Sequence, residues 1–508
     1  MSSLWIANAD PATAWAHQTW SGLSARPDKD RTLVVLPVHG FADHGFGLPL
    51  NTEETVGSSV LRGAITSANT QAHVLVLPPL RLAAAPYAHT HFGVDTETAL
   101  DALNEIIAGV KASGFTRILF FNTSPWNGEI VATVALDARV TCNLRTYVIS
   151  TAGLGLGFHP ADANRPRTQA VASHLLHRTP APTSAPADVR DTDFRPGYFN
   201  QPAAPAPDAA LNGAQLFTEA TSRLADLLVE IVAHDTGLTL PPPSAVTAPA
   251  VVVTAQSREL SALTADELAA LPDKARALVI IPTGAIEQHG HHLPLGTDAL
   301  LGRIWLDHTL PKLSPDARVF IAPPLTYGKS TEHSDFCGTI SLSARTLRRQ
   351  LLALAANLKA LGFRQIAVLN THGGNSAVIV PVLREMQTTL GLRAGMLSGH
   401  YRASQSPQES AFGFHAGEWE TSLLLAATPS LVHMDRAVCE YPARIDSPGS
   451  LRPESAAAVF AWKTSDLSQS GVLGDATLAT PEKGARWLDE ASTALARKIE
   501  SLLNSAPL

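Results

Sequence analysis

The strongest constraint on this sequence is an internal repeat, because one long unit occurs twice. "RTLVVLPVHGFADHGFGLPLNTEE" in the first copy and "RALVIIPTGAIEQHGHHLPLGTDA" in the second share a Leu-Pro-Leu segment and a His-Gly pair. Two further pairs of segments match in the same order at nearly the same spacing, which indicates a tandem duplication. The matched pairs are 31–54 with 276–299, 73–80 with 318–325, and 114–127 with 362–375.

Each copy alternates short apolar runs with amphipathic stretches of helical length. The runs are rich in Val, Ile and Leu, as expected for buried parallel strands. The stretch 344–363 is typical of a helix that ends near Gly362. This alternation predicts an α/β fold in which each copy has a mainly parallel sheet and right-handed crossovers. The runs are "TLVVLP", "HVLVLPP", "RILFFN", "ALVIIP", "RVFIAPP" and "QIAVLN".

The length of 508 residues predicts two domains, since one core rarely serves a chain this long. We place the first domain at 1–237 and the second at 257–508, joined by a Pro/Ala-rich linker at 238–256. A second Pro/Ala-rich stretch, 179–207, is interpreted as an expanded surface loop of the first domain.

Composition excludes several classes of partner. The net charge is −7, whereas nucleic-acid binding favours basic patches. No apolar run approaches the ~18 residues that a membrane helix needs, and the N-terminus lacks the pattern of a secretory signal peptide. The three cysteines suit a reducing compartment rather than a disulfide framework. We therefore expect a cytoplasmic protein without nucleic-acid or membrane partners.

Polar clusters follow the predicted strands of the second copy. Glu287 and His289 come after the strand "ALVIIP", with Asp298 at the end of the following loop, and His372 comes after "QIAVLN". Ligands of open α/β sheets bind beyond the carboxyl ends of the strands. A third cluster, "FHAGEWETS" (414–422), is also placed at a strand end. Imidazoles and carboxylates together, without thiolates, favour Zn²⁺, Mn²⁺ or Fe²⁺ in a catalytic rather than a structural site.

The number of candidate ligands favours two metals. Three carboxylates and two imidazoles exceed what one catalytic metal usually binds, whereas a pair bridged by Asp298 accommodates all of them. A single buried histidine is more often structural than a ligand, so His291 and His292 are interpreted as supporting residues.

The motifs of the second copy together resemble the creatininase (creatinine amidohydrolase) family. The resemblance spans about 257–508 and implies an α/β/α fold with a divalent-metal centre, and the repeat extends that fold to two tandem domains. It also implies hydrolysis of non-peptide C–N amide bonds, in cyclic amides or formamides, by a metal-activated water. Relatives that process the mycofactocin precursor cleave a peptide instead. The motifs are "GAIEQHGHHLPLGTD", "NTHGGN", "HAGEWETS" and "GVLGDATLATPEKG".

The resemblance assigns roles to individual residues. It implies two divalent metals per site, Zn with Mn or Fe as alternatives, and Glu420 as the fifth ligand. Creatininase proper takes a glutamate where this chain has Gly374, which disfavours creatinine itself as the substrate. His415 matches the proton-transfer histidine of the family and would protonate the leaving nitrogen. The implied metal ligands are Glu287, His289, Asp298, His372 and Glu420, and the implied catalytic residues are His415 and Glu420.

The segment "YGKSTEHSDFCGT" (327–339) resembles the substrate-side loop of the family. It supplies Ser330, Glu332 and His333 as candidate pocket residues. Asn375 joins them, as does Trp419, which is equally well interpreted as a core residue.

The first copy has lost most of these candidate ligands. Ala42 stands in place of Glu287 and Ser124 in place of His372, while a histidine and an acid remain at 44 and 53. We therefore interpret it as a degenerate domain without the family metal site. The alternative is a remodelled site built from His39, Asp43, His44, His89 and His91.

These observations predict a metal-dependent amidohydrolase that acts on a small-molecule amide through its second domain. A peptide-processing hydrolase of the mycofactocin-precursor type and a non-catalytic metal-binding scaffold remain as alternatives. We also expect a homo-oligomer, in which the two fused copies act as a built-in pseudo-dimer.

Overall fold

A computed structural model describes most of the chain. Three parts of the sequence-based prediction fall outside it: His89, the Pro/Ala-rich stretch 179–207, and the linker from 247 to 256. The described ranges are 10–45, 47–85, 90–159, 162–178, 210–246, 258–398, 404–442, 451–454 and 458–504.

Both copies contain a parallel sheet with the same strand order. In the first copy the order is β2-β1-β6-β7, with β3 paired to the end of β1. In the second copy it is β9-β8-β10-β11, so with β3 left aside both sheets have the chain order second, first, third, fourth. The duplication inferred from sequence is therefore a duplication of fold. The strands are β1 (Leu33–His39), β2 (Val74–Val76), β3 (Leu80–Arg81), β6 (Arg117–Asn122), β7 (Arg145–Ser150), β8 (Leu278–Thr283), β9 (Val319–Ile321), β10 (Gln365–Asn370) and β11 (Arg393–Ser398).

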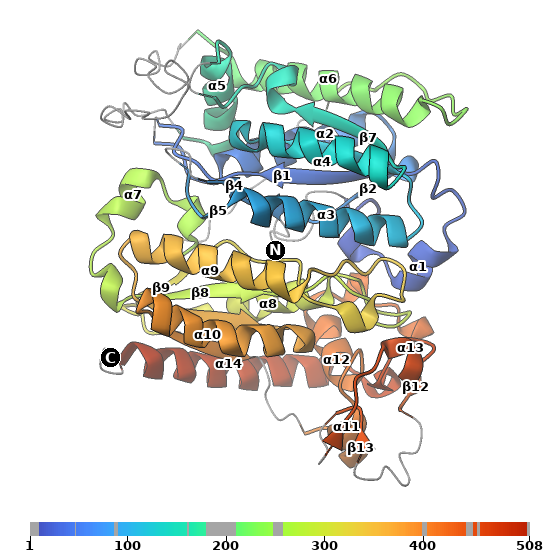
Figure 1. The fold of residues 1–508 in the computed structure, drawn as a ribbon, viewed down its shortest axis with the longest axis vertical. Coiled ribbons are helices and arrows are strands. Elements are labelled where there is room, and N and C mark those ends of the chain that lie inside the picture. The colour runs from blue at the N-terminus through green and yellow to red at the C-terminus, as the bar shows by residue number, and fades with distance from the viewer. Residues whose placement is uncertain are drawn as a thin grey trace.

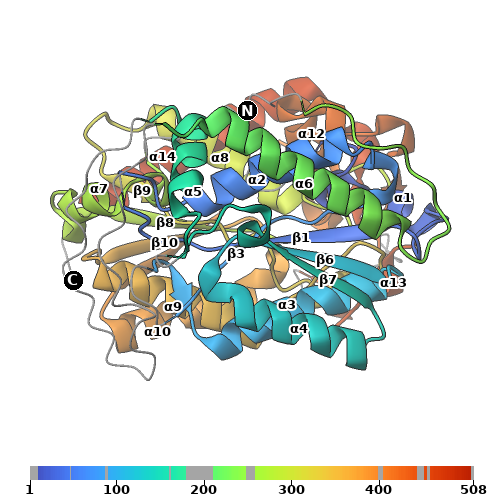
Figure 2. The same ribbon diagram turned by 90° about the horizontal axis from the view of Figure 1, so that it is seen from above.

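Helices cover both faces of each sheet, so each copy has three layers in the order α/β/α (Figure 2). One face of the first sheet carries α2 (Thr52–Ser67), α5 (Arg165–Leu176) and α6 (Gly213–Ala233), which pack together. The other face carries α3 (Thr96–Ala112) and α4 (Gly128–Thr141). The second copy repeats this arrangement with α8 (Thr297–Thr309), α12 (Glu418–Ala427) and α14 (Pro481–Asn504) on one face and α9 (Ala344–Ala360) and α10 (Ser376–Leu390) on the other.

Short elements complete the described fold and surround the sheet edges. Four of them are helices of one or two turns, and six are strands of two residues. They are α1 (Trp20–Ala25), α7 (Ala265–Ala270), α11 (Pro407–Phe412), α13 (Thr464–Leu467), β4 (Ala83–Ala84), β5 (Gly93–Val94), β12 (Cys439–Glu440), β13 (Leu451–Arg452), β14 (Ala458–Val459) and β15 (Gly474–Asp475).

The six apolar runs are strands, as predicted, because each is buried between helix layers. Every residue of β1, β6, β8 and β10 is buried. The strands β7 and β11, at one edge of each sheet, were not predicted from sequence. They carry polar and partly exposed side chains, and Val148 of β7 is 46% exposed, whereas β2 and β9 at the opposite edges are apolar and mostly buried.

The two copies stack with α3 of the first against α9 of the second (Figure 1). Two apolar clusters cross the boundary, and the larger contains Trp15 and Ile106 from the first copy and Leu295 and Ile340 from the second. The Trp15 indole is fully buried, and its Nε1–H donates to the carbonyl of Gly338 across the boundary at 3.0 Å. The copies therefore share apolar core across this boundary. Within the described residues, no helix has the length and apolar character needed to cross a bilayer.

Candidate metal centre

The five predicted ligands converge at one end of the second sheet. Glu287 and His289 lie in the loop after β8, and His372 follows β10 directly. Asp298 and Glu420 lie instead in the first turns of α8 and α12. The placement of the third motif at a strand end was therefore wrong, because Glu420 is carried by a helix N-terminus. Such a position suits a carboxylate, since the unpaired N–H groups of the first turn make it electropositive.

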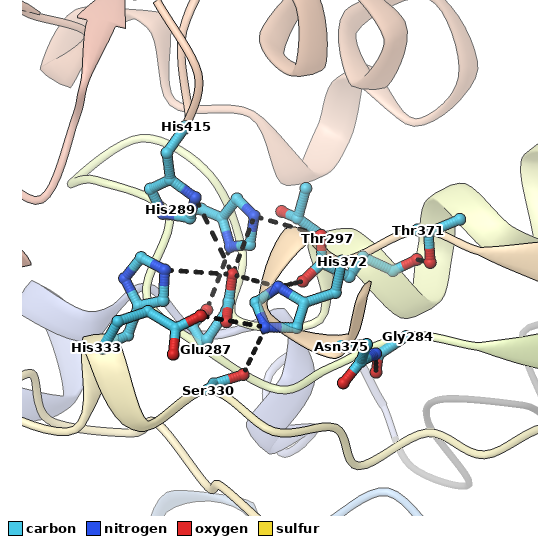
Figure 3. Close-up of polar contacts among 12 residues, drawn as sticks. Gly284, Glu287, His289, Thr297, Ser330, His333, Thr371, His372, Asn375 and His415 are labelled. Carbon is cyan, nitrogen blue, oxygen red and sulfur yellow. Dashed lines mark hydrogen bonds and ion pairs between the residues drawn. The ribbon is translucent and has the colours of Figure 1, made fainter. Parts of the chain in front are cut away.

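Asp298 lies between the two imidazoles and presents one oxygen to each (Figure 3 shows the surrounding side chains). Its Oδ1 is 3.5 Å from His289 Nε2, and its Oδ2 is 3.4 Å from His372 Nδ1. Glu287 Oε1 is 3.1 Å from His372 Nδ1, and Glu420 Oε2 is 3.9 Å from His289 Nε2. Glu287, Asp298 and His372 form one group of potential ligands, and His289 and Glu420 form another together with His415. Asp298 Oδ1 at 3.5 Å and Glu287 Oε1 at 3.9 Å both reach His289 from the first group, so a residue bridging two metals is sterically available here.

Several polar atoms of this cluster are buried without a hydrogen-bond partner. They are both carboxylate oxygens of Glu287, Nε2 of His289 and Oδ2 of Asp298. A buried polar atom left unpaired costs about 1–3 kcal/mol, and such atoms are rare in folded proteins. Four of them facing one another fit a centre built to hold cations. The donor set of two imidazoles and three carboxylates suits Zn²⁺, Mn²⁺ or Fe²⁺.

The charges of the metal-free cluster shift its pKa values strongly. Burial alone would lower the pKa of His289, but the carboxylates of Asp298, Glu420 and Glu287 outweigh it and raise the pKa to about 9. Burial would also lower the pKa of His372, but Glu287 and Asp298 outweigh it and raise this pKa well above its usual range. Burial raises the pKa of Glu287. Without metal, protons on the imidazoles therefore balance part of the buried negative charge.

His415 and His333 lie on the opposite side of Glu287 from His372. His415 Nδ1 is 3.8 Å and His333 Nε2 is 3.5 Å from Glu287 Oε1, and the two rings stack with centroids 4.2 Å apart. Burial, reinforced by nearby imidazoles, holds the pKa of both well below the usual value. Both histidines are therefore neutral at physiological pH.

Gln288 contacts both of these histidines. His415 Nε2 is 2.8 Å from the Gln288 carbonyl, which can only accept, so the proton of His415 lies on Nε2 and its Nδ1 lone pair faces the cluster. The Gln288 amide nitrogen donates to the Gly471 carbonyl at 3.0 Å and lies 2.9 Å from His415 Nε2 and from His333 Nδ1. His333 Nδ1 is also 2.7 Å from Thr464 Oγ1, so Gln288 and Thr464 together orient this ring and turn its Nε2 towards Glu287. Sequence reasoning missed Gln288, although its position between two ligands was the available signal.

The loop 327–339 contacts the Nε2 side of the His372 ring, whose Nδ1 faces Asp298. His372 Nε2 donates to the Lys329 carbonyl at 2.9 Å, and Ser330 Oγ lies 3.2 Å away. The Glu332 carboxylate is 3.6 Å from the same nitrogen and is paired with Lys329 Nζ at 2.9 Å. A Cβ at Gly374 would lie 2.0 Å from that carboxylate, so Glu332 occupies the space beside Gly374. Ser330 and Glu332 thus contact a predicted ligand directly.

A cavity of about 230 Å³ opens beside the cluster. Its walls include Trp305, Trp419 and Phe414, and both Glu420 and His415 reach it. Among the described residues that line it, none is Lys or Arg. Trp419 lines the cavity and also packs against Trp487 in the core, with ring centroids 5.3 Å apart, so both interpretations of this residue hold.

Asn375 and His292 are not among the residues that line this cavity. Their side chains instead hold neighbouring backbone segments and the helix α12 in place. The Asn375 side chain accepts from Lys329 N at 2.8 Å and donates to the Gly284 carbonyl at 3.0 Å, which ties the loops after β8 and β9 together. His292 Nε2 is 2.8 Å from Thr421 Oγ1, next to Glu420 in α12.

Glu409 is a second residue that the sequence did not reveal. It is 1% exposed and accepts hydrogen bonds from Glu418 N at 2.9 Å, Asp475 N at 2.8 Å and Tyr441 Oη at 2.7 Å. Two of these donors, Tyr441 and Asp475, lie more than 30 residues away along the chain, so no local pattern marks the residue. Its carboxylate fixes the start of α12, and with it Glu420.

The first copy keeps only a remnant of this arrangement. His44 Nε2 lies 3.2 Å from Glu53 Oε1, and the other oxygen of Glu53 accepts from Gly40 N at 2.8 Å. His39 donates to or accepts from Thr123 Oγ1 at 3.0 Å, and burial lowers its pKa to about 4. Among the described residues of this copy, no three potential ligands come together. The remodelled site thus lacks support in the described chain, and His89 lies outside it.

Comparison with known proteins places this geometry in context. The family model described as creatininase, creatinine amidohydrolase, matches residues 16–230 and 261–499. The mycofactocin precursor peptide peptidase of Mycobacterium ulcerans is 36% identical over 218 residues, which is 42% of this chain and 80% of that protein. The creatinine amidohydrolase of Pseudomonas putida is 30% identical over 233 residues, 42% of this chain and 84% of that protein. The solved structure "Creatininase Mn" is 27% identical, covers 49% of this chain and 100% of its own, and has a TM-score of 0.41.

Proposed function

The chain belongs to the creatininase family, and from this premise we propose that its second copy is a metal-dependent amidohydrolase. The observation that carries the proposal is the buried cluster in which Asp298 offers one oxygen to each of two imidazoles. A core or capping role would leave such atoms paired, whereas four of them have no hydrogen-bond partner.

We propose that the cluster holds two divalent metals. Glu287 and His372 would bind one, His289 and Glu420 the other, with Asp298 between them. When bound, such a pair activates a water and polarises the amide carbonyl. Zinc is the first candidate, with manganese and iron as alternatives, because the ligand types suit all three.

His415 is proposed as the group that moves the proton. Its Nδ1 carries a lone pair that faces the cluster, and the Gln288 carbonyl holds the proton on the opposite nitrogen. It can take a proton from the nucleophile and deliver it to the leaving nitrogen, as general acid–base catalysis requires. His333 Nε2 lies on the same side of Glu287, 3.5 Å from its Oε1, and is placed to contact the substrate.

The cavity supports a neutral amide as substrate. Aromatic walls and the lack of Lys or Arg among its described lining residues suit an uncharged ring or chain better than a carboxylate or phosphate. We propose a non-peptide C–N bond in a cyclic amide or a formamide. The presence of Gly374, with Glu332 beside it, disfavours creatinine itself.

A peptide is the second candidate substrate. It is favoured by the 36% identity to a relative named mycofactocin precursor peptide peptidase, against 30% to a relative named creatinine amidohydrolase.

The composition of the chain supports the proposal that the reaction takes place in the cytoplasm.

A substrate screen tests the proposal. The full chain is loaded with Zn²⁺, Mn²⁺ or Fe²⁺ and offered lactams, formamides, hydantoin-like rings and short peptides. Hydrolysis that is lost in Glu287→Ala and His289→Ala supports the amidohydrolase, and the substrate class separates the two candidates. Metal-loaded protein that hydrolyses none of these substrates would instead favour a non-catalytic metal-binding scaffold.

A further inference from the structure

The two copies brace each other through reciprocal backbone contacts. The carbonyls of Ala16 and Gln18 accept from Gly296 N at 2.8 Å and Leu295 N at 2.9 Å, in the loop that leads to Asp298. In the other direction, the carbonyls of Ser261 and Leu263 accept from Asn51 N and Leu50 N, each at 2.9 Å. The two sets correspond through the 245-residue offset of the repeat. Ala16 and Gln18 match Ser261 and Leu263, and Leu50 and Asn51 match Leu295 and Gly296. The copies are thus related by an approximate two-fold axis, as in an isologous dimer.

One side chain breaks this symmetry. Trp20 is the first residue of α1, which is capped by Thr19, and its counterpart Ala265 is the first residue of α7, which is capped by Thr264. The first copy therefore extends an indole towards the second copy, where the metal ligands are intact. At the equivalent position, the second copy presents only the methyl group of Ala265 towards the first copy, where the ligands are lost.

Trp20 contacts all three loops that wall the metal centre on the side of the first copy. Its ring packs on His291, with centroids 4.9 Å apart, in the loop between His289 and Asp298. It meets Phe336 edge to face at 5.0 Å, close to His333. Its Nε1–H donates to the Ser470 carbonyl at 3.1 Å. The next residue, Gly471, accepts from the Gln288 amide, which also lies 2.9 Å from His333 Nδ1 and from His415 Nε2.

We propose that the first copy serves as a built-in partner subunit and that Trp20 is its positioning residue for the metal centre of the second copy. Trp20 contacts no predicted ligand. It acts through His291, in the segment that carries Gln288 and three predicted ligands, and through Phe336 and Ser470, in two loops that contact Gln288 by way of His333 and Gly471. This role explains why a copy without its own ligand set keeps an intact fold. The inference rests on the proposed function, because it requires that the second copy holds metal.

Co²⁺ binding to the full chain tests the proposal, because affinity and the visible absorption spectrum both report ligand geometry without a substrate. Trp20 is half-buried, so Trp20→Ala should fold, and its melting curve verifies this. Residues that orient ligands typically change metal affinity by about 10- to 100-fold when replaced. We expect Trp20→Ala to weaken Co²⁺ binding about 10-fold or more and to alter the spectrum. Trp20→Phe keeps the ring but not the N–H, and should fall between wild type and Trp20→Ala.

Arg345→Ala is the matched control. Arg345 pairs with Asp101 across the same boundary at 2.9 Å, is 68% exposed, and touches none of the three loops. It should keep wild-type Co²⁺ affinity. A Trp20→Ala chain with unchanged affinity and spectrum would overturn the proposal, as would an Arg345→Ala chain that loses as much affinity as Trp20→Ala. A wild-type chain that binds no Co²⁺ would overturn the proposed function as well.

Discussion

At the scale of single residues, the centre is governed by one buried carboxylate between two imidazoles. Asp298 and Glu287 are fully buried, and without metal their charge is balanced by protons on His289 and His372. Metal and protons therefore compete for the same nitrogens. This competition gives the centre a defined dependence on pH.

Metal binding should release protons at neutral pH and tighten as the pH rises. Ligating imidazoles must be neutral, whereas the metal-free pKa of His289 is about 9, so at pH 7 its proton must leave. The direction follows from the raised pKa of His289. Below about pH 9 the proton on this imidazole competes with the metal, and the competition weakens as the pH approaches 9. Calorimetric titration at pH 7 in buffers of different ionisation enthalpy should show protons released to the buffer. Binding without proton release would contradict these pKa shifts.

His415→Ala should retain metal but lose turnover. The residue faces the cluster through Nδ1 as a neutral base, and a positioned acid–base group contributes about 10²- to 10⁴-fold in rate. With the substrate identified by the screen, kcat should fall at least about 100-fold while metal content stays at the wild-type level. Metal loss in this variant would make His415 a ligand instead.

The sequence identified the candidate ligands that the structure brings together, but not the residues that hold them in place. Glu287, His289, Asp298, His372 and Glu420 were recognisable because two motifs follow strands and the family resemblance supplies the third. Gln288 and Glu409 were not, because their roles depend on partners more than 40 residues away along the chain, such as Gly471 and Asp475. Such contacts exist only once the loops have folded together.

At the scale of elements, the apolar strands were predictable, including β2 and β9 at one edge of each sheet, whereas β7 and β11 at the other edge were not. "RILFFN" and "QIAVLN" correspond to β6 and β10 residue by residue, since both faces of these strands are covered. The strands β7 and β11 carry mixed polar and apolar side chains, so no apolar run marks them in the sequence. The third motif was misplaced because its glutamate begins the helix α12 rather than ending a strand.

Glu409 should be required for the correct start of α12. Glu409→Ala would leave the buried N–H groups of Glu418 and Asp475 without their acceptor. At about 1–3 kcal/mol for each, the free energy of unfolding should fall by about 2–6 kcal/mol, and metal content should fall with it. Chemical denaturation and elemental analysis measure the two effects. Glu482→Ala, an exposed acid in α14, is the control, and equal losses in both variants would contradict this role.

At the scale of the whole molecule, duplication followed by loss has produced two unequal halves. The shared apolar core and the reciprocal backbone contacts join them as closely as subunits of a dimer. The repeat offset in the sequence predicted the two equivalent sheets. It could not predict that Trp20 reaches the opposite copy, because the direction of a short N-terminal helix is set by tertiary packing alone.

We also expect the fused chain to assemble further. A protein that contains a built-in pseudo-dimer can replace a pair of single-copy subunits in a symmetric homo-oligomer. Mass photometry at nanomolar concentration should give a multiple of the mass of one chain. A strict monomer across the concentration range would remove this expectation and leave the pseudo-dimer as the complete assembly.

The central claim, a metal centre confined to the second copy, is tested most directly by elemental analysis of two matched variants. Asp298→Ala removes the residue proposed to bridge both metals, and Glu53→Ala removes its counterpart in the first copy. Each protein is loaded, desalted and measured as metal per folded chain. Wild type and Glu53→Ala should each hold about two divalent ions, and Asp298→Ala should lose them. Full metal content in Asp298→Ala, or its loss in Glu53→Ala, would contradict the account.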